Sequence, residues 1–304
     1  MNENDDCKGS AVCMTPSETA AGVRLLVLDI DGTVVDESNR VRDSVARAVR
    51  SAERRGVAVV IATGRLYQSS LAAYESIGST LPLICYEGAL IRQPHTGLVH
   101  RHWALEPDVV ALMLDHAEPL SLGGRLSVHL YAQDNLYVSN LNDASIRYFG
   151  RSKAEPIVVR DLRQLLNRAA TKVIVLSDDF RVIARLASRL ENSSSRTQVK
   201  QYESVALLEA FHPAVNKRLA VSYLAEVLMG LRPENVMAIG DDFTDIEMLR
   251  YAGIGVAMGN APAAVKAFAD WVTTSVERDG VAEAVERWIL HPGFRRPPPP
   301  AATG

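Results

Sequence analysis

The stretch "RLLVLDIDGTVVD", residues Arg24–Asp36, decides the fold. Its unbroken run of leucine and valine is typical of a strand that is buried on both faces, as in a parallel sheet. Residues two apart in a strand point the same way, so Asp29 and Asp31 project from one face where the run ends. Gly32 lets the chain turn away there. Open α/β sheets place their ligands at this carboxyl edge, so we predict a polar site around the two aspartates.

Strand and helix patterns alternate at both ends of the chain. After the first strand come an amphipathic helix that closes at Gly56, the buried strand "VAVVIATG", a helix over about 65–77 and a third strand, "LPLICYEGAL". From Asn216 onward, helices alternate with the strands "VMAIG", "GIGVAM" and "WVTTS". Helices of this length between strands predict right-handed βαβ units and one parallel, Rossmann-like α/β sheet.

The segment between these two parts has a different pattern. "RLSVHLYAQDNLYVSN" predicts a hairpin around a Gln-Asp-Asn turn, and the strand "TKVIVLS" and two strands across "QVKQYESVALLEAF" follow it. We also predict helices near 142–149 and 161–170 and over "DFRVIARLASRL". Adjacent strands with helices to one side indicate a separate, inserted α+β unit. The predicted organisation is a core domain of residues 23–90 and 212–290, an inserted domain of 91–211, and disordered tails at 1–22 and 291–304.

The composition excludes several classes of protein. Of the 304 residues, 47% are hydrophobic and 23% charged, and the formal net charge is -3, so nothing favours a nucleic-acid or membrane partner. No apolar run reaches membrane-spanning length, and the acidic first 21 residues do not have the pattern of a signal peptide. The three cysteines have no metal-binding spacing and suggest no disulfide framework, which is typical of a protein in a reducing compartment. We therefore expect a cytoplasmic protein, a monomer or homodimer, whose partner is a small molecule.

A second acidic cluster follows the strand "VMAIG" and contains Asp241, Asp242 and Asp245. If this strand and the first one belong to the same sheet, the carboxylates of both clusters converge at one edge. Carboxylates so close together repel one another, and a divalent cation removes that repulsion. Mg²⁺ prefers one or two carboxylates together with waters and a phosphate oxygen. The pattern therefore favours a magnesium site, although Asp242 alone fits an ordinary helix N-cap.

The motif "DIDGTVVD" resembles the first motif of the haloacid dehalogenase-like (HAD) phosphohydrolases, Asp-x-Asp-Gly-Thr/Val after a strand. "IATGR" resembles the second motif, "VNKRLAVSYLAEVLMG" around Lys217 the third, and "IGDDFTDIEML" the fourth. The sequence "VAMGNAPAAVKAFADWVTTSVERDGVAEAVE" is similar to the closing segment of the Cof-type branch. The resemblance extends from Arg24 to about Leu290. It implies a HAD core whose insertion is a cap of the C2 type, B subtype (C2B).

The resemblance also implies a role for each matching residue. Asp29 is the expected nucleophile, which forms an aspartyl-phosphate, and Asp31 is the expected acid and base for the leaving alcohol and the hydrolytic water. The expected cofactor is Mg²⁺, held by the Asp29 carboxylate, the Asp31 backbone carbonyl and Asp241, with Asp245 behind them or bound through water. The expected phosphate-binding residues are Thr63, Gly64, Lys217 and Thr244.

Two positions depart from the Cof-type pattern. Thr244 stands where that branch commonly has Asn, and "GDDFTD" also resembles the motif of trehalose-phosphate phosphatases. Glu87 in "YEGAL" stands where the family usually has the Asn of Asn-Gly-Ala. A fixed negative charge near a phosphate is unfavourable unless it faces the metal's waters or a substrate cation or hydroxyl. Two roles are possible for Arg65: it helps to bind the phosphate, or it pairs with a surface carboxylate.

These residues predict a Mg²⁺-dependent phosphomonoesterase that acts on a small phosphorylated metabolite such as a sugar phosphate. The inserted cap would close over the cleft, exclude water and select the leaving group. Three alternatives remain: a phosphomutase with the same nucleophile, a phosphatase for a disaccharide phosphate, and a regulator that binds a phosphometabolite without turnover. The substrate cannot be read from the sequence, because the cap loops that choose it have no motif.

Overall fold

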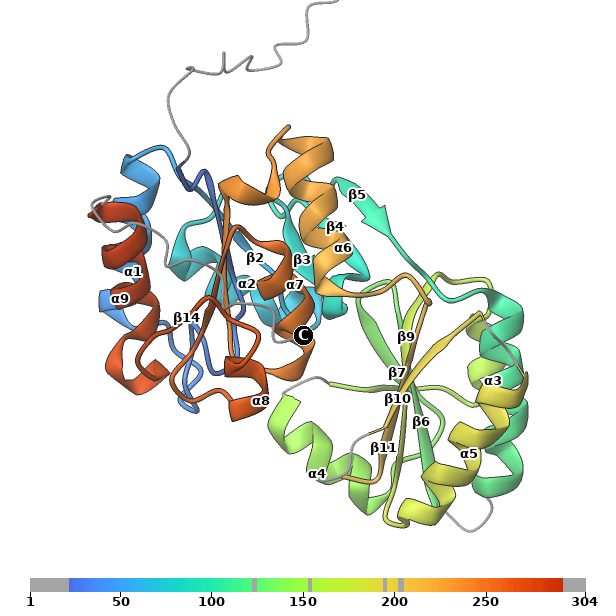
Figure 1. The fold of residues 1–304 in the computed structure, drawn as a ribbon. Helices are drawn as coiled ribbons and strands as arrows, with labels where there is room; N and C mark the ends of the chain where they lie inside the picture. Colours follow the sequence, from blue (N-terminus) through green and yellow to red (C-terminus); the bar gives the residue numbers. More distant parts are fainter. Residues whose placement is uncertain (1–21, 122–124, 153–154, 194–195, 202–204, 292–304) are drawn as a thin grey trace, which may run out of the picture.

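The computed structural model describes residues 22–121, 125–152, 155–193, 196–201 and 205–291. Two sheets, each with its own helices, lie side by side (Figure 1). The predicted tails lie almost entirely outside the described residues, as do Cys7 and Cys13, whereas Cys85 is a buried free thiol.

The first sheet has five parallel strands in the order β14-β13-β12-β1-β2. β1 is an inner strand, and its residues alternate between two apolar clusters: Leu26 and Leu28 face one, Leu25 and Val27 the other. The prediction of a strand buried on both faces is therefore confirmed. The strands are β1 (Leu25–Leu28), β2 (Ala58–Ile61), β12 (Val236–Gly240), β13 (Ile254–Ala257) and β14 (Trp271–Val272).

Helices cover both faces of this sheet (Figure 1). α1, α2 and α9 pack on the Leu26 face, and α6, α7 and α8 pack on the Leu25 face. α1 ends just before Gly56, whose φ of 80° is left-handed and stops the helix. The helices are α1 (Asp43–Arg54), α2 (Tyr67–Ile77), α6 (Lys217–Ser222), α7 (Ile246–Tyr251), α8 (Ala263–Lys266) and α9 (Gly280–Val285); α6 and α9 continue as π-helical turns.

The predicted third strand of the parallel sheet is only partly present. β3 (Leu83–Cys85) joins β2 through the single bridge between Ala62 and Ile84, and otherwise pairs antiparallel with β4 (Leu90–Arg92), which pairs with β5 (Val99–His102). The strand stops because Tyr86, Glu87 and Gly88 have φ values of 52°, 58° and 99°. A strand cannot continue through left-handed residues, so the chain forms a short 3₁₀ turn over Tyr86–Gly88 instead.

The second sheet has six strands in the order β10-β11-β9-β6-β7-β8, all antiparallel except the β7–β8 pair. β6 and β7 form the predicted hairpin, whose turn residues Gln133 and Asp134 have φ values of 52° and 61°, as a type I′ turn requires. The strands are β6 (Leu126–Ala132), β7 (Asn135–Val138), β8 (Ile157–Val158), β9 (Ala170–Ser177), β10 (Gln198–Gln201) and β11 (Leu207–Phe211).

The two faces of the second sheet differ. α3 (Pro107–Ser121) and α5 (Phe180–Ser193) cover one face and share an apolar cluster with it. On the other face, near α4 (Asp143–Ser152), the sheet residues Tyr131 and Phe211 belong to the same apolar cluster as residues of the core. This unit is therefore an α+β cap whose second face is turned toward the core.

One predicted helix of the cap is wrong. Residues 161–170 contain only a 3₁₀ turn, Leu162–Leu165, which begins where the Asp161 side chain accepts a hydrogen bond from the Arg163 N–H at 2.9 Å. The chain cannot extend this turn into a helix of the predicted length because Ala170 is already part of β9. The fold class is nevertheless confirmed as a parallel α/β core with an inserted α+β cap; the exact domain boundaries stay a prediction.

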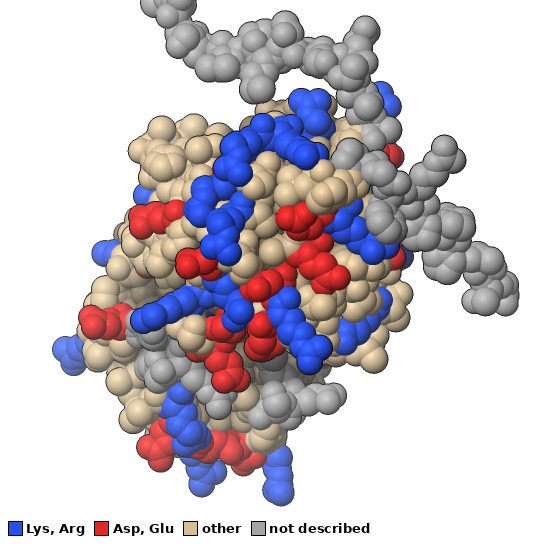
Figure 2. All heavy atoms as spheres, turned by 90° about the vertical axis from the view of Figure 1, so that its left-hand side faces the viewer, with Lys and Arg blue, Asp and Glu red and all other residues tan. Residues whose placement is uncertain are grey.

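One face of the core reflects the balanced composition of the chain. On the face that carries α1 and α9, basic and acidic side chains are interspersed (Figure 2). Among the helices that the structure describes, none is long and apolar enough to cross a membrane.

Candidate active site

The paired strands β1 and β12 bring two acidic segments together. Leu28 lies opposite Ile239 in the parallel register, so Asp29 after β1 and the loop after β12 emerge at the same edge of the sheet. One carboxylate oxygen from each of Asp29, Asp241 and Asp245 lies within 4.8 Å of the other two. The structure thus gathers three of the predicted site residues into one acidic cluster.

Lys217 is the buried cation of this cluster. Its Nζ atom donates hydrogen bonds to Asp29 Oδ1 and Asp245 Oδ1, both at 2.6 Å, and its side chain is only 2% exposed. Lys217 begins α6, which starts there because Asn216 Oδ1 accepts a hydrogen bond from the Leu219 N–H at 2.7 Å. Burial lowers the pKa of Lys217, but the carboxylates around it, led by Asp245 and Asp29, outweigh burial and hold the pKa well above its usual value. The ammonium therefore stays charged.

Asp245 holds the loop after β12 in place. Its Oδ2 atom accepts hydrogen bonds from the backbone N–H groups of Asp241 and Asp242, at 2.9 and 3.0 Å, and its Oδ1 atom accepts from Lys217. Asp245 therefore accepts three hydrogen bonds from the protein, one of them from a charged ammonium group, which fits a supporting position behind a metal ion better than direct coordination. Asp242 is exposed and occupies the N-cap position of the 3₁₀ turn Phe243–Asp245.

Asp241 is oriented by residues from two other loops. Thr33 Oγ1 donates to Asp241 Oδ1 at 3.2 Å, and Asn260 Nδ2 donates to Asp241 Oδ2 at 3.1 Å and to the Gly32 carbonyl at 2.8 Å. Gly32 has a φ of 70°, and a Cβ atom added to it would lie 2.2 Å from Asp241 Oδ2. Only glycine therefore lets the first motif approach this carboxylate so closely.

The sequence analysis did not identify the contribution of Asn260 or Thr33. Asn260 lies in the loop after β13, the next strand of the sheet, and its Oδ1 atom also accepts a hydrogen bond from the Val276 N–H at 2.9 Å. The rule that located Asp241, a polar residue after a buried parallel strand, applies equally to Asn260 and could have found it.

The electrostatics of the cluster fit a bound divalent cation. Burial raises the pKa of Asp29 well above its usual value; Lys217 opposes this shift, and Asp245 and Asp241 add to it. Burial, followed by the charge of Asp245, raises the pKa of Asp241 to about 7. These are carboxylates whose negative charge is incompletely balanced by the protein, and hard oxygen donors of this kind are the ligands that Mg²⁺ prefers.

The Asp31 carboxylate does not belong to the cluster of Asp29, Asp241 and Asp245 and pairs with Arg65 instead. The guanidinium donates from Nε to Asp31 Oδ2 at 2.8 Å and from Nη2 to Oδ1 at 2.5 Å. The Asp31 side chain is 64% exposed, whereas that of Arg65 is 18% exposed. Of the two roles considered for Arg65, the structure shows the pairing with a carboxylate. The partner is Asp31, the residue predicted to act as acid and base.

The remaining predicted phosphate-binding residues line the end of β2 and the turn after β12. Thr63 is buried, and its Oγ1 atom accepts a hydrogen bond from the Arg65 N–H at 3.2 Å. Beside it, a Cβ atom on Gly64 would lie 2.2 Å from Glu87 Oε1, so a carboxylate covers this glycine. Thr244 is half-buried in the 3₁₀ turn that ends at Asp245.

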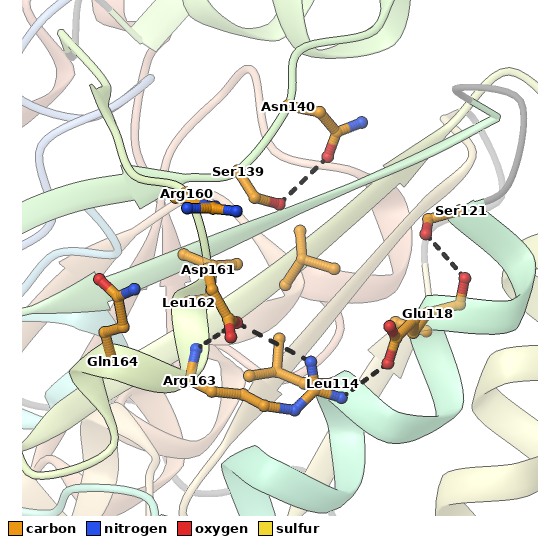
Figure 3. Close-up of a pocket in the computed structure, with 12 residues that line it drawn as sticks. Leu114, Glu118, Ser121, Ser139, Asn140, Arg160, Asp161, Leu162, Arg163 and Gln164 are labelled. Carbon is orange, nitrogen blue, oxygen red and sulfur yellow. Dashed lines mark hydrogen bonds and ion pairs between the residues drawn. The ribbon is translucent and has the colours of Figure 1, made fainter.

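A separate cavity of about 500 Å³ lies in the cap, between the end of α3, the residues that follow β7 and the 3₁₀ turn at Leu162–Leu165. Arg163 spans part of it and forms an ion pair with Glu118 at 2.8 Å (Figure 3). It also pairs with Asp115 at 2.7 Å. None of the motif residues lines this cavity. The candidate active site is therefore the acidic edge of the core, not the cavity in the cap.

Residues 26–285 match the haloacid dehalogenase-like hydrolase family, and this extent shows that the chain belongs to that family. A Bacillus subtilis (strain 168) relative, 5-amino-6-(5-phospho-D-ribitylamino)uracil phosphatase, is 30% identical over 270 residues, which are 88% of this chain and 96% of the relative. The chain is thus a phosphatase of the HAD type, and phosphatases of this family generally use Mg²⁺.

Solved structures of the family have the same architecture. A haloacid dehalogenase-like hydrolase from Bacteroides thetaiotaomicron superposes with a TM-score of 0.78 at 26% identity, over 87% of this chain and 99% of that one. A HAD subclass IIB sugar phosphatase shares the fold at 22% identity, with a TM-score of 0.72 over 87% of this chain and 98% of its own. The predicted family, with its HAD core and inserted cap, is confirmed.

Proposed function

We propose that this phosphatase is a Mg²⁺-dependent phosphomonoesterase that hydrolyses a small phosphorylated metabolite through an aspartyl-phosphate on Asp29. The observation that carries the proposal is the buried Lys217 ammonium, 2.6 Å from an oxygen of Asp29 at the carboxyl end of β1, with the oriented Asp241 carboxylate beside it. Phosphoryl transfer depends mainly on positioning and charge neutralisation, and these groups supply both.

Asp29 is the proposed nucleophile. Lys217 holds Asp29 Oδ1, and we assign the attack on phosphorus to the other oxygen, Oδ2. A bond forms between Oδ2 and phosphorus while the ester bond to the leaving alcohol breaks, and a water molecule then hydrolyses the acyl phosphate. Lys217, Thr63, Gly64 and Thr244 are the proposed contacts to the phosphoryl oxygens.

Asp31 is the proposed acid for the leaving alcohol and base for the water. Both of its oxygens accept hydrogen bonds from Arg65 in the free protein, and an acid needs a proton on one of them. The Asp31–Arg65 pair must therefore open when substrate binds. Arg65 is then free to pair with the negatively charged phosphoryl group, so its guanidinium exchanges one anionic partner, Asp31, for another.

The residues that would hold Mg²⁺ are Asp29, Asp241 and the backbone carbonyl of Asp31, with Asp245 behind them. When bound, Mg²⁺ screens the negative charge of Asp29 from the anionic phosphoryl group. Thr33 and Asn260 keep Asp241 turned toward this position through their hydrogen bonds.

A phosphorylated sugar or polyol is the substrate class that we propose. The Bacillus relative, which matches this chain over nearly its whole length, is named for a substrate whose phosphate is on a ribityl chain. We further propose that the protein acts on its metabolite in the cytoplasm, as a monomer or homodimer and without a nucleic-acid or membrane partner.

The test is phosphate release from a panel of sugar phosphates, polyol phosphates, nucleotides and a generic aryl phosphate, with Mg²⁺ and with EDTA. The expected result is metal-dependent release that disappears in Asp29→Asn. Release that survives Asp29→Asn would show that another residue is the nucleophile. Bisphosphate-dependent isomerisation with little free phosphate would instead identify a phosphomutase, and tight binding without either reaction a regulator.

A further inference from the structure

Glu87 occupies a fixed and unusual position in the wall of the active site. It is the middle of three successive left-handed residues, with a φ of 58°. Its N–H donates to the Thr63 carbonyl at 3.0 Å, and the preceding N–H, that of Tyr86, donates to the Arg65 carbonyl at 3.0 Å. On the other side, Gly88 packs so closely on α6 that an added Cβ atom would lie 2.6 Å from the Asn216 carbonyl oxygen. The loop is thus wedged between the end of β2 and the start of α6.

The Glu87 carboxylate lies where the phosphate-binding residues converge. Its Oε1 atom covers Gly64, and its Oε2 atom is 4.0 Å from Lys217 Nζ, beyond hydrogen-bond distance. The side chain is 14% exposed, but the Oε2 atom is buried and has no hydrogen-bond donor among the described residues. A buried acceptor without a donor is unfavourable, so this atom is poised to accept a hydrogen bond from a bound molecule.

The same loop faces the cap. The Tyr86 hydroxyl donates to Asp134 Oδ1 in the hairpin turn of the cap at 3.2 Å, and the Tyr86 and Tyr131 rings meet edge to face with centroids 6.4 Å apart. In the cap sheet, Lys172 bonds Glu209 at 3.1 Å; burial lowers the pKa of Lys172, but Glu209 and, more weakly, Glu87 help to hold it above its usual value. Glu87 therefore lies between the phosphate-binding end of β2 and the cap, on the side where the leaving group must sit.

We infer that Glu87 is a specificity-determining residue that accepts a hydrogen bond from the leaving group and rejects leaving groups that carry a carboxylate near the phosphate ester. A hydroxyl or ammonium group supplies the missing donor to Oε2. A second anion would instead meet the negative charge of Glu87, whose side chain is only 14% exposed, so the repulsion is only weakly screened by solvent. The inference rests on the proposed function and narrows its substrate to polyol-like or amine-bearing phosphate esters.

Three esters of similar size separate these cases: glycerol 3-phosphate with a neutral leaving group, phosphoethanolamine with a cationic one, and 2-phosphoglycolate with an anionic one. Their dissociation constants are measured by calorimetry with Mg²⁺ in the Asp29→Asn protein, so that turnover does not matter. We expect 2-phosphoglycolate to bind about tenfold more weakly than the other two, as one incompletely screened charge pair implies. In the double variant Asp29→Asn with Glu87→Gln, the dissociation constant of 2-phosphoglycolate should lie within about twofold of those of the other two esters, because the repulsion is gone.

Matched variants keep the test decisive. Glu87→Asn is a second neutral variant, because asparagine tolerates the left-handed backbone better than other side chains, and it should behave like Glu87→Gln. Glu75→Gln, which removes an exposed carboxylate on α2, should leave the order of affinities unchanged. The inference would be overturned if the ratio of dissociation constants did not change in either neutral Glu87 variant. It would also be overturned if the Asp29→Asn protein with Glu87 intact bound all three esters equally. Phosphate release by the wild-type protein is measured separately, and its absence would count against the proposed function alone.

Discussion

Gly32 and Asp241 lie so close together that a methyl group on Gly32 would overlap the Asp241 carboxylate, with its Cβ atom 2.2 Å from Oδ2. The contact joins the loop after β1 to the loop after β12. Gly32 also has a left-handed φ of 70°, so the position combines a close approach with a backbone conformation that other residues adopt at a cost.

Gly32→Ala should therefore displace Asp241 and weaken Mg²⁺ binding by at least about tenfold, in addition to a loss of stability of about 1 kcal/mol from the backbone. Calorimetric titration with Mg²⁺ measures the first effect, and urea unfolding the second. Gly56→Ala is the matched control, because Gly56 has a φ of 80° but nothing within 4 Å of an added Cβ atom. It should lose similar stability and keep its metal affinity; equal metal affinity in the two variants would contradict the argument.

Lys217→Met should destabilise the metal-free protein by about 3–5 kcal/mol, because it leaves the buried carboxylates of Asp29 and Asp245 without their cation. Mg²⁺ should restore part of this loss, since it supplies positive charge to the same cluster. The measurement is urea unfolding in EDTA and in Mg²⁺. Arg250→Met, which removes an exposed arginine on α7, is the control; a similar small effect in both variants would show that the Lys217 pairs contribute little.

Mg²⁺ affinity should rise with pH up to about 7, because the pKa of Asp241 is raised to about 7 by burial and by Asp245 and its proton must leave before the carboxylate binds metal. The expected slope is at least about tenfold for each pH unit below that point, because Asp241 loses one proton and the pKa of the second proposed ligand, Asp29, is also raised by burial. The metal-free protein should show the opposite trend: a carboxyl with a raised pKa stabilises the folded state at low pH, and this contribution is lost as the pH rises through about 7.

Titrations with Mg²⁺ at several pH values check this prediction, together with unfolding in EDTA at the same pH values. Asp241→Asn is the control, because it removes the titrating group and should flatten the pH dependence as well as weaken binding. A pH-independent affinity between pH 5 and pH 7 would mean that Asp241 is not a ligand.

The cap should lose stability in acid through His129. Burial lowers the pKa of this imidazole to about 4, and its Nε2 atom is hydrogen-bonded to Ser145 Oγ at 2.9 Å. The unfolded chain has the ordinary pKa near 6.5, so it binds more protons than the folded state between these values, and stability falls as the pH drops from about 6.5 to about 4. The loss should be about 2–3 kcal/mol by pH 4. Urea unfolding of wild type and His129→Gln across this range isolates the effect, which the variant should lack.

The placement of Asp29 and Asp241 could be predicted because it depends only on backbone pattern. A buried parallel strand ends at a known edge, and the polar residue that follows it must lie there. The same reasoning reaches Asn260. It does not reach the pairing of Asp31 with Arg65, since two loop side chains choose among several partners according to geometry that no local pattern encodes.

Glu87 shows the second limit of prediction. Its sequence pattern continues a strand, but three left-handed residues turn the chain and direct the carboxylate toward Gly64. The wrong helix over 161–170 has a different cause: the chain enters β9 at Ala170, and the tertiary pairing of that strand limits a local pattern that fits a helix. The family's motifs lie in the core, where the parallel sheet constrains them, whereas the cap has no comparable rule for its loops.

The position of β1 has a consequence for synthesis of the protein. One edge of β1 pairs with β2, which follows soon after it, but the other edge pairs with β12, which begins only at Val236. A growing chain on the ribosome therefore carries an apolar half-sheet with an open edge while the entire cap is being made. The cap is complete before β12 is made, so it can fold first. Open strand edges pair readily with other strands, so the unfinished core needs protection from aggregation until the last third of the chain has emerged.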